Sequence, residues 1–260
     1  MSEAPPLLQE TRDGVAWLIL NRPQARNALS RGLMTALEGA LETAAADKAV
    51  KIVVIAGAGP AFCAGHDLRE IRAEPGRAAY EALFEQCSRL MTRITRLPKP
   101  VIARVHGVAT AAGCQLVASC DLAIAAETAR FATPGVNIGL FCSTPMVALS
   151  RAVGRKQAME MLLTGDLVDA GRAREIGLIN RVVPESELDA AVTALAQQIA
   201  AKSPLTLAIG KEAFYRQAEM ALDDAYAYAS EVMTRNMLAR DAEEGIDAFL
   251  AKRPPVWTGE

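Results

Sequence analysis

Cysteine and histidine are scarce in this chain of 260 residues, which contains five cysteines and two histidines. An odd number of cysteines cannot pair completely, and none of them has a CxxC or zinc-like spacing. We therefore expect small buried thiols in a reducing compartment, with neither a disulfide framework nor a bound metal. The cysteines are Cys63, Cys87, Cys114, Cys120 and Cys142.

A strong charge of one sign is also absent, because 28 Lys and Arg residues balance 30 Asp and Glu residues. This balance gives no electrostatic reason to expect a nucleic acid or a membrane as partner. The first residues, MSEAPPLLQE, are polar and acidic and include no long apolar run. We therefore expect no signal or transit peptide, no membrane span, and a cytoplasmic protein.

Short apolar runs separated by helical patterns predict an α/β fold. The runs 15–20, 51–56 and 101–105 are rich in Val, Ile and Leu and predict strands, the second buried on both faces. Between the first two runs, Ser30 is a suitable N-cap for a helix to about Asp47. This order of strand, helix and strand is typical of an α/β core.

The last part of the chain is expected to be helical from Pro204 to about Lys252. We therefore predict a core over residues 1–203 and a helical oligomerisation region over residues 204–260. An equally simple interpretation is that the apolar residues of these helices pack onto their own core. The residues concerned include Leu205, Ile209, Ala213, Phe214, Tyr226, Tyr228, Met233 and Met237.

Two windows of small residues indicate a site for a carbonyl oxygen. In FCAGHDL, Gly65 permits a backbone conformation that would turn the N–H of His66 into a cleft. In ATAAGCQLVASCD, a helix that begins near Ala112 would present unpaired N–H groups. Two such donors pointing at one position form an oxyanion hole. Taken alone, each window is better explained as a tight packing turn.

Six segments in a fixed order resemble the crotonase (enoyl-CoA hydratase/isomerase) superfamily. The resemblance covers about Val15 to Trp257 and is greatest for the subgroup of enoyl-CoA hydratase domain-containing proteins, through GHDL, ATAAGCQLVASCD and ATPGVNIGLFCST. It implies an α/β fold, a spiral of ββα units with a C-terminal helical trimerisation region, and a homotrimer or a dimer of trimers. The segments are NRPQARNAL, GPAFCAGHDL, 107–121, FATPGVNIGL, RAVGRKQAMEMLLTG and AREIGLINRVV.

The same resemblance implies an acyl-CoA substrate, with coenzyme A as part of that substrate and no separate cofactor. It assigns the two oxyanion donors to the backbone of His66 and Ala112, and it brings Arg69 near the CoA phosphates. Phe249 and Lys252 match a pair that reaches the CoA of a neighbouring subunit. The substrate-binding positions implied are Ala64, His66, Asp67, Leu68, Arg69, Ala112, Phe249 and Lys252.

One departure from the family pattern decides the expected mechanism. Hydratases of this superfamily carry two glutamates that activate water, and these positions are Gln115 and Gly135 here. Glutamine cannot take a proton at neutral pH and glycine has no side chain, so we expect ordinary hydratase activity to be weak or absent.

Two alternatives stay open from the sequence. The chain either catalyses another reaction of a CoA thioester or binds acyl-CoA without catalysis. Candidates for the side chain that would act on the acyl group are Asp67, His66, Ser143 and Thr144. For Ser143 and Thr144, a helix N-cap ahead of Pro145 is a simpler role.

Overall fold

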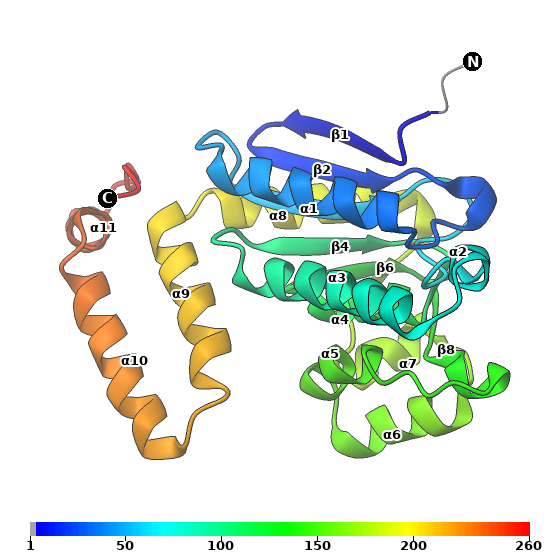
Figure 1. Ribbon diagram of the computed structural model, residues 1–260. Helices are drawn as coiled ribbons and strands as arrows, with labels where there is room; N and C mark the ends of the chain where they lie inside the picture. Colours follow the sequence, from blue (N-terminus) through cyan, green and yellow to red (C-terminus); the bar gives the residue numbers. More distant parts are fainter. Residues whose placement is uncertain (1–3) are drawn as a thin grey trace.

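The computed structural model describes residues 4–260 and shows two β-sheets covered by helices (Figure 1). The larger sheet has the order β1-β2-β3-β4-β6-β9, and its strands are parallel except for the β1–β2 pair. Its strands are β1 (Leu7–Arg12), β2 (Val15–Leu20), β3 (Ile52–Gly57), β4 (Val101–Val105), β6 (Leu122–Ala126) and β9 (Arg181–Val183). The smaller sheet contains β5 (Val108–Thr110), β7 (Arg130–Ala132) and β8 (Val168–Asp169).

Helices follow most strands of the larger sheet. Those of the core are α1 (Arg31–Ala46), α2 (Leu68–Ala73), α3 (Arg77–Arg96), α4 (Ala112–Ser119), α5 (Pro145–Ala152), α6 (Arg155–Thr164), α7 (Ala170–Glu175) and α8 (Leu188–Ala200). Short 3-10 turns lie at Pro23–Ala25, Pro134–Ile138 and Glu185–Glu187. The C-terminal helices are α9 (Pro204–Gln217), α10 (Leu222–Met237) and α11 (Arg240–Leu250).

After four strands of the larger sheet, the chain passes through a short second-layer segment before the next helix. After β4 this segment is β5, after β6 it is β7, and after β2 and β3 it consists of single β-bridges. The bridges join Leu29 to His66 and Cys63 to Ala109. This repeated strand, second-layer step and helix is the spiral of ββα units that the resemblance implies.

Apolar packing on both faces of the larger sheet explains the regular elements. One face packs against α1, α3 and α4, and the other face packs against α8. All six residues of β3 are buried, as the continuous apolar run predicts. In α1, the Ser30 side chain accepts the N–H of Leu33, which confirms the predicted N-cap.

The sequence expectation differs from the structure at both ends of the chain. We predicted no strand at β1, and its burial pattern explains why, because only Leu7 is buried. The helical run expected to about Lys252 is divided into α9, α10 and α11. Helix α9 begins at Pro204, while the division into two functional regions at that point stays a prediction.

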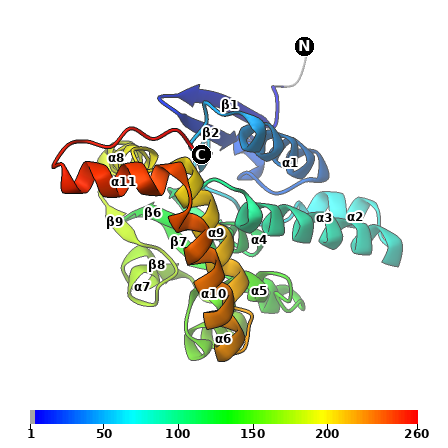
Figure 2. The same ribbon diagram turned by 90° about the vertical axis from the view of Figure 1, so that its left-hand side faces the viewer.

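The C-terminal helices project from the core. Helices α9 and α10 lie side by side, and α9 contacts the core through α3 (Figures 1 and 2). No residue of α9 and only Val232 of α10 is buried in the single chain. The large exposed apolar residues on these helices are Phe214, Leu222, Tyr226, Met233, Met237, Leu238, Ile246, Phe249 and Leu250.

Candidate active site

Two backbone N–H groups without an acceptor lie at the ends of two segments that meet beside Gly65. Neither the N–H of His66 nor that of Ala112 donates a hydrogen bond to any of residues 4–260. In the parallel bridge to Leu29, the bonds are made by Gly65 O and Asp67 N. The alternation of a β-strand therefore turns the N–H of His66 away from Leu29. The N–H of Ala112 is unpaired because Ala112 is the first residue of α4.

Two glycines allow these segments to approach one another. A β-carbon on Gly65, whose φ is +97°, would lie 2.9 Å from Ala111 Cβ and 3.4 Å from Ala112 N. A β-carbon on Gly113 would collide with the carbonyl group of Cys63. Cys63 is itself paired with the small sheet, since it accepts the N–H of Thr110 at 2.9 Å. The two segments that carry the free N–H groups are therefore packed closely together at Gly65 and Gly113.

Ala111 lies in a strained backbone conformation immediately before α4. Its φ of 51° and ψ of −119° lie in a region that residues with a β-carbon rarely adopt. Such strain costs on the order of 1–3 kcal/mol and is concentrated at functional sites. Here it turns the chain sharply enough for the N–H of Ala112 to face Gly65 instead of continuing β5.

The imidazole of His66 is shielded and unpartnered. Neither ring nitrogen has a hydrogen-bond partner in the described chain, and the ring meets that of Phe84 edge to face at 5.8 Å. Burial lowers the pKa of His66, an effect that the Leu29 carbonyl offsets in part. The ring is therefore neutral at pH 7 and retains one donor and one acceptor.

Asp67 is fully engaged and cannot serve as a free acid. Its Oδ2 accepts the guanidinium of Arg22 at 2.8 Å, and its Oδ1 accepts the N–H groups of Arg69 and Glu70 at the start of α2. Burial alone would raise the pKa of Asp67, but these hydrogen bonds hold the pKa below its ordinary value. Among the sequence candidates for acid–base chemistry, Asp67 is therefore a structural ion-pair partner.

Gln115 lies one turn into α4 with its side chain 4% exposed. Its Oε1 lies 3.8 Å from the thiol of Cys87, and its Nε2 donates to none of residues 4–260. A carboxamide in this place offers hydrogen bonds but no proton-accepting carboxylate.

Gly135 leaves no space for a side chain. A β-carbon there would lie 2.7 Å from Leu140 O and 2.9 Å from Cys142 Sγ. The loop that follows the Pro134–Ile138 turn therefore fills the space in which a glutamate at this position would begin.

Ser143 and Thr144 lack an activating partner. The Ser143 hydroxyl donates weakly to Phe141 O at 3.4 Å. Thr144 occupies the predicted N-cap position of α5, but its side chain makes no capping hydrogen bond. The helix begins at Pro145, a residue that is favoured at the first helical position.

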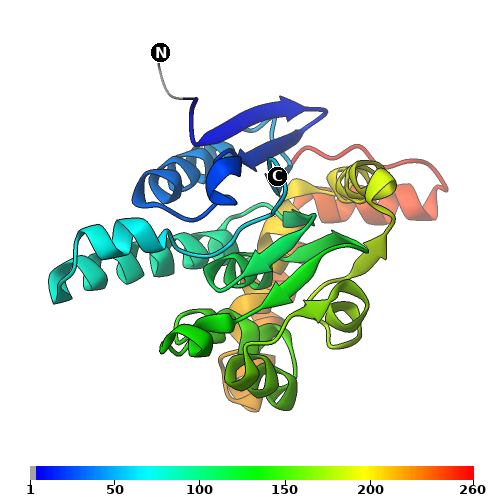
Figure 3. The ribbon, with the colours of Figure 1, turned by 90° about the vertical axis from the view of Figure 1, so that its right-hand side faces the viewer.

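The other expected binding residues fall into two separate groups. Ala64, Leu68 and Arg69 lie beside His66, and Leu68 and Arg69 are exposed on the first turn of α2. Phe249, which is 82% exposed, and Lys252 lie at the end of α11. Figures 1 and 3 place α2 and α11 at opposite ends of the molecule, so a single chain does not bring the two groups together.

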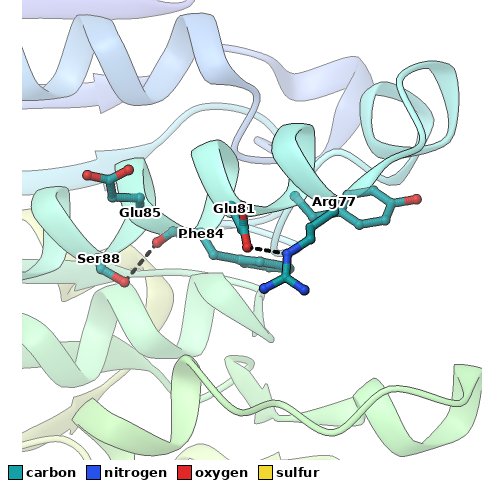
Figure 4. A pocket seen from close by; sticks show the side chains of 6 residues that line it. Arg77, Glu81, Phe84, Glu85 and Ser88 are labelled. Atoms are coloured by element: carbon teal, nitrogen blue, oxygen red, sulfur yellow. Dashed lines mark hydrogen bonds and ion pairs between the residues drawn. The ribbon is translucent and has the colours of Figure 1, made fainter.

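An open hollow extends from Phe84 along one face of α3, and the sequence did not indicate it. It has a volume of about 810 Å³. Figure 4 shows the ring of Phe84 beneath the helix and Arg77 paired with Glu81 at 2.7 Å. Phe84 lines this hollow and also contacts the imidazole of His66. Its lining residues are Arg77, Tyr80, Glu81, Phe84, Glu85 and Ser88.

Within residues 4–260, none of the helices has the length and apolar character needed to cross a membrane.

Comparisons with known proteins place the chain in a large group of relatives. The family model described as enoyl-CoA hydratase/isomerase matches residues 10–260. The rat mitochondrial enoyl-CoA hydratase domain-containing protein 3 is 46% identical, covering 98% of this chain and 86% of its own. The 2,3-dehydroadipyl-CoA hydratase of Escherichia coli is 37% identical, covering 97% of this chain and 98% of its own.

Solved structures agree with this grouping. A crystal structure of an enoyl-CoA hydratase from Mycobacterium smegmatis has a TM-score of 0.95 at 56% identity, covering 98% of this chain and 99% of its own. Human enoyl Coenzyme A hydratase domain-containing protein 3 has a TM-score of 0.94 at 46% identity, covering 97% of this chain and 100% of its own.

One expectation is corrected by these relatives. The rat, frog, mouse and human proteins at 46% identity are all named as mitochondrial, which contradicts the cytoplasmic location expected from the polar first residues. The first ten residues are therefore a poor guide to location. The matches over nearly the whole length show that the chain belongs to the enoyl-CoA hydratase/isomerase (crotonase) family, in its subgroup of enoyl-CoA hydratase domain-containing proteins.

Proposed function

We propose that this protein binds an acyl-CoA and holds the thioester oxygen between the N–H groups of His66 and Ala112. The observation that carries the proposal is that both donors are free and lie on segments that pack closely together at Gly65 and Ala111. Preorganised N–H donors stabilise an oxygen that becomes negative in a transition state, and losing one such donor typically costs about 2.7–4 kcal/mol of barrier.

The residues around the donors indicate where each end of the ligand binds. Arg69 is exposed at the start of α2, and a guanidinium there suits the phosphates of coenzyme A. The hollow along α3 begins at Phe84 and offers room for an acyl chain. Coenzyme A then enters as part of the substrate, and no separate cofactor is proposed.

We further propose that the site does not hydrate 2-enoyl-CoA at the rate of its two-glutamate relatives. Gln115 offers an amide, and the loop around Leu140 and Cys142 closes the space at Gly135. General acid–base groups contribute about 10²–10⁴-fold to such rates.

A reaction other than hydration is the second candidate, and His66 is the residue that favours it. Two titratable side chains, those of His66 and Asp67, lie next to the donors. Asp67 is paired with Arg22, whereas the imidazole of His66 makes no hydrogen bond within residues 4–260. A neutral imidazole can accept a proton in an isomerase or a hydrolase. Without such a reaction the protein is a non-catalytic acyl-CoA binder.

Affinity measurements by calorimetry test the binding site. Butanoyl-CoA has the thioester oxygen, whereas the thioether S-butyl-CoA differs by lacking it. Two hydrogen bonds at about 1 kcal/mol each predict that the thioester binds roughly 30-fold more tightly. Equal affinities for the two ligands would contradict the oxyanion hole.

Chromatographic separation and mass analysis of the ligand after incubation distinguish the two candidates, because double-bond isomers share one mass but differ in retention. A series of saturated, 2-enoyl and 3-enoyl CoA thioesters is incubated with the protein and compared with the His66→Gln variant. A wild-type product that this variant does not form supports an isomerase or hydrolase. Recovery of every ligand intact supports the non-catalytic binder.

We propose a homotrimer, or a dimer of trimers, built through the C-terminal helices. These helices leave large apolar residues such as Leu222, Tyr226 and Leu238 more than two-thirds exposed in the single chain. In such an assembly, Phe249 and Lys252 would reach the CoA bound by a neighbouring subunit. Light scattering should give three or six times the mass of one chain, and a monomeric mass would contradict the proposal.

A further inference from the structure

We propose that Arg22 is a positioning residue for the N–H of His66, acting through the carboxylate of Asp67. The inference rests on the proposed acyl-CoA site. Arg22 lies before the Pro23–Ala25 turn, 45 positions away from Asp67. Its side chain makes no contact with the free N–H groups in the structure, so its effect must pass through the backbone that it holds.

The guanidinium joins both sides of the bridge that orients His66. Its NH1 group donates to Ala28 O at 2.7 Å, and Ala28 precedes Leu29 on one side of the bridge. Its NH2 group donates to Asp67 Oδ2 at 2.8 Å, and Asp67 follows His66 on the other side. The planar fork of arginine suits this arrangement, whereas the single ammonium of lysine does not.

The bridge needs this support because one of its two hydrogen bonds is long. Leu29 donates to Gly65 O at 2.7 Å, but Asp67 donates to Leu29 O at 3.3 Å. The ion pair acts at the weaker end, next to the N–H that would bind the substrate oxygen. Both side chains are largely shielded, at 23% and 15% exposure, so water weakens the pair less than it would on the surface.

Arg22 is itself held in place by Asn27. The N–H of Arg22 donates to Asn27 Oδ1 at 2.8 Å, and Asn27 Nδ2 donates to Ala58 O and Ala61 O. Asn27 is completely buried and has a φ of 54°. The segment NRPQARNAL thus forms a clamp around the backbone that carries His66, which gives this motif a role in the site.

The test compares butanoyl-CoA with S-butyl-CoA, because their affinity ratio reports the oxyanion donors and not the rest of the ligand. In Arg22→Met we expect the preference for the thioester to fall about fivefold, as expected for one misplaced hydrogen bond. Asp67→Asn should give a similar loss, since asparagine keeps the cap of α2 but not the charge. If Arg22→Met does not fold, Asp67→Asn takes its place in the test.

The double variant Arg22→Met/Asp67→Asn distinguishes positioning from a general effect. If Arg22 acts through Asp67, the double variant loses no more preference than the more affected single variant. Losses that multiply in the double variant would overturn the inference.

Lys211→Met is the matched control, because Lys211 and Asp121 form a similarly shielded ion pair at 2.6 Å outside the site. It should destabilise the fold and leave the affinity ratio unchanged. A ratio unchanged within twofold in Arg22→Met and Asp67→Asn would overturn the inference while leaving the proposed function intact. A wild-type protein without thioester preference would overturn both.

Discussion

The Sγ atom of Cys142 lies 2.9 Å from the point where a β-carbon on Gly135 would stand. The carbonyl oxygen of Leu140 is even closer to that point, at 2.7 Å, and as a backbone atom it cannot rotate away. The absence of a side chain at position 135 is therefore built into the loop conformation. A larger residue there requires the loop to move.

Gly135→Ala should destabilise the protein by about 1–3 kcal/mol, because the added methyl group overpacks the loop. Gly39→Ala is the control, since Gly39 lies within α1 with nothing within 4 Å of the added β-carbon. There the substitution should stabilise the helix by about 0.5–1 kcal/mol. Urea unfolding of both variants measures the difference, and equal stabilities would show that the loop yields easily.

Restoring both glutamates should not restore hydration. In Gln115→Glu/Gly135→Glu, the second carboxylate has no space next to Cys142, so we expect less than about a tenfold gain in hydration of a short 2-enoyl-CoA. The carboxylate at 115 would be buried, and burial favours its neutral form. The single variant Gln115→Glu serves as the comparison. A gain of a hundredfold or more in the double variant would contradict the packing argument.

Stability should fall as the pH is lowered from about 7.5 to 5.5. Burial lowers the pKa of both His66 and His106 from 6.5. The unfolded chain therefore binds more protons in this range, so stability is complete well above pH 6.5 and decreases as the pH falls through 6.5. His106 is held neutral because its Nδ1 accepts from Arg104 at 2.9 Å while its Nε2 donates to Gly59 O at 2.8 Å.

Denaturant unfolding at three pH values within this range measures the effect. The variants His66→Gln and His106→Gln should each be less stable at pH 7.5 but show a smaller change with pH. A wild-type stability that rises towards pH 5.5 would show that these histidines are not held neutral by the fold.

The attachment of α9 to the core should depend on Lys211. Its ammonium donates to Asp121 Oδ2 and also to the carbonyl oxygens of Ile94 and Lys99. Burial lowers the pKa of Lys211 and raises that of Asp121, so each charge depends on the other. Lys211→Met leaves a shielded carboxylate without its cation and should cost about 3–5 kcal/mol.

The matched surface control is Arg89→Met, because Arg89 and Glu85 are both more than half exposed. It should change stability by less than about 1 kcal/mol. Urea unfolding compares the two variants. Equal losses would mean that the buried pair contributes no more than a surface pair.

Local patterns in the sequence predicted the elements that carry the site. The strands β2 and β4 have the predicted bounds and α4 begins at Ala112 as predicted, because continuous apolar runs and a glycine-rich start leave few alternatives. The small residues around Gly65 and Ala111 indicated a close approach, and the structure shows one.

Contacts between distant segments could not be predicted in the same way. The pairing of Arg22 with Asp67 and the packing of Cys142 against Gly135 depend on how the spiral stacks its turns. The hollow at Phe84 runs along one face of α3, and no local pattern in the sequence indicated it. The ion pair with Arg22 excludes Asp67 as a free acid, and this pairing was not evident from the sequence.

The most direct test of the central claim is the rate of hydration of 2-butenoyl-CoA by the wild-type protein, followed by the loss of enoyl-thioester absorbance. The same preparation must first bind butanoyl-CoA more tightly than S-butyl-CoA. We predict a rate at least about 10²-fold below that of a relative with both glutamates. Hydration at the rate of such a relative would contradict this prediction, because Gln115 and Gly135 would then not limit the chemistry.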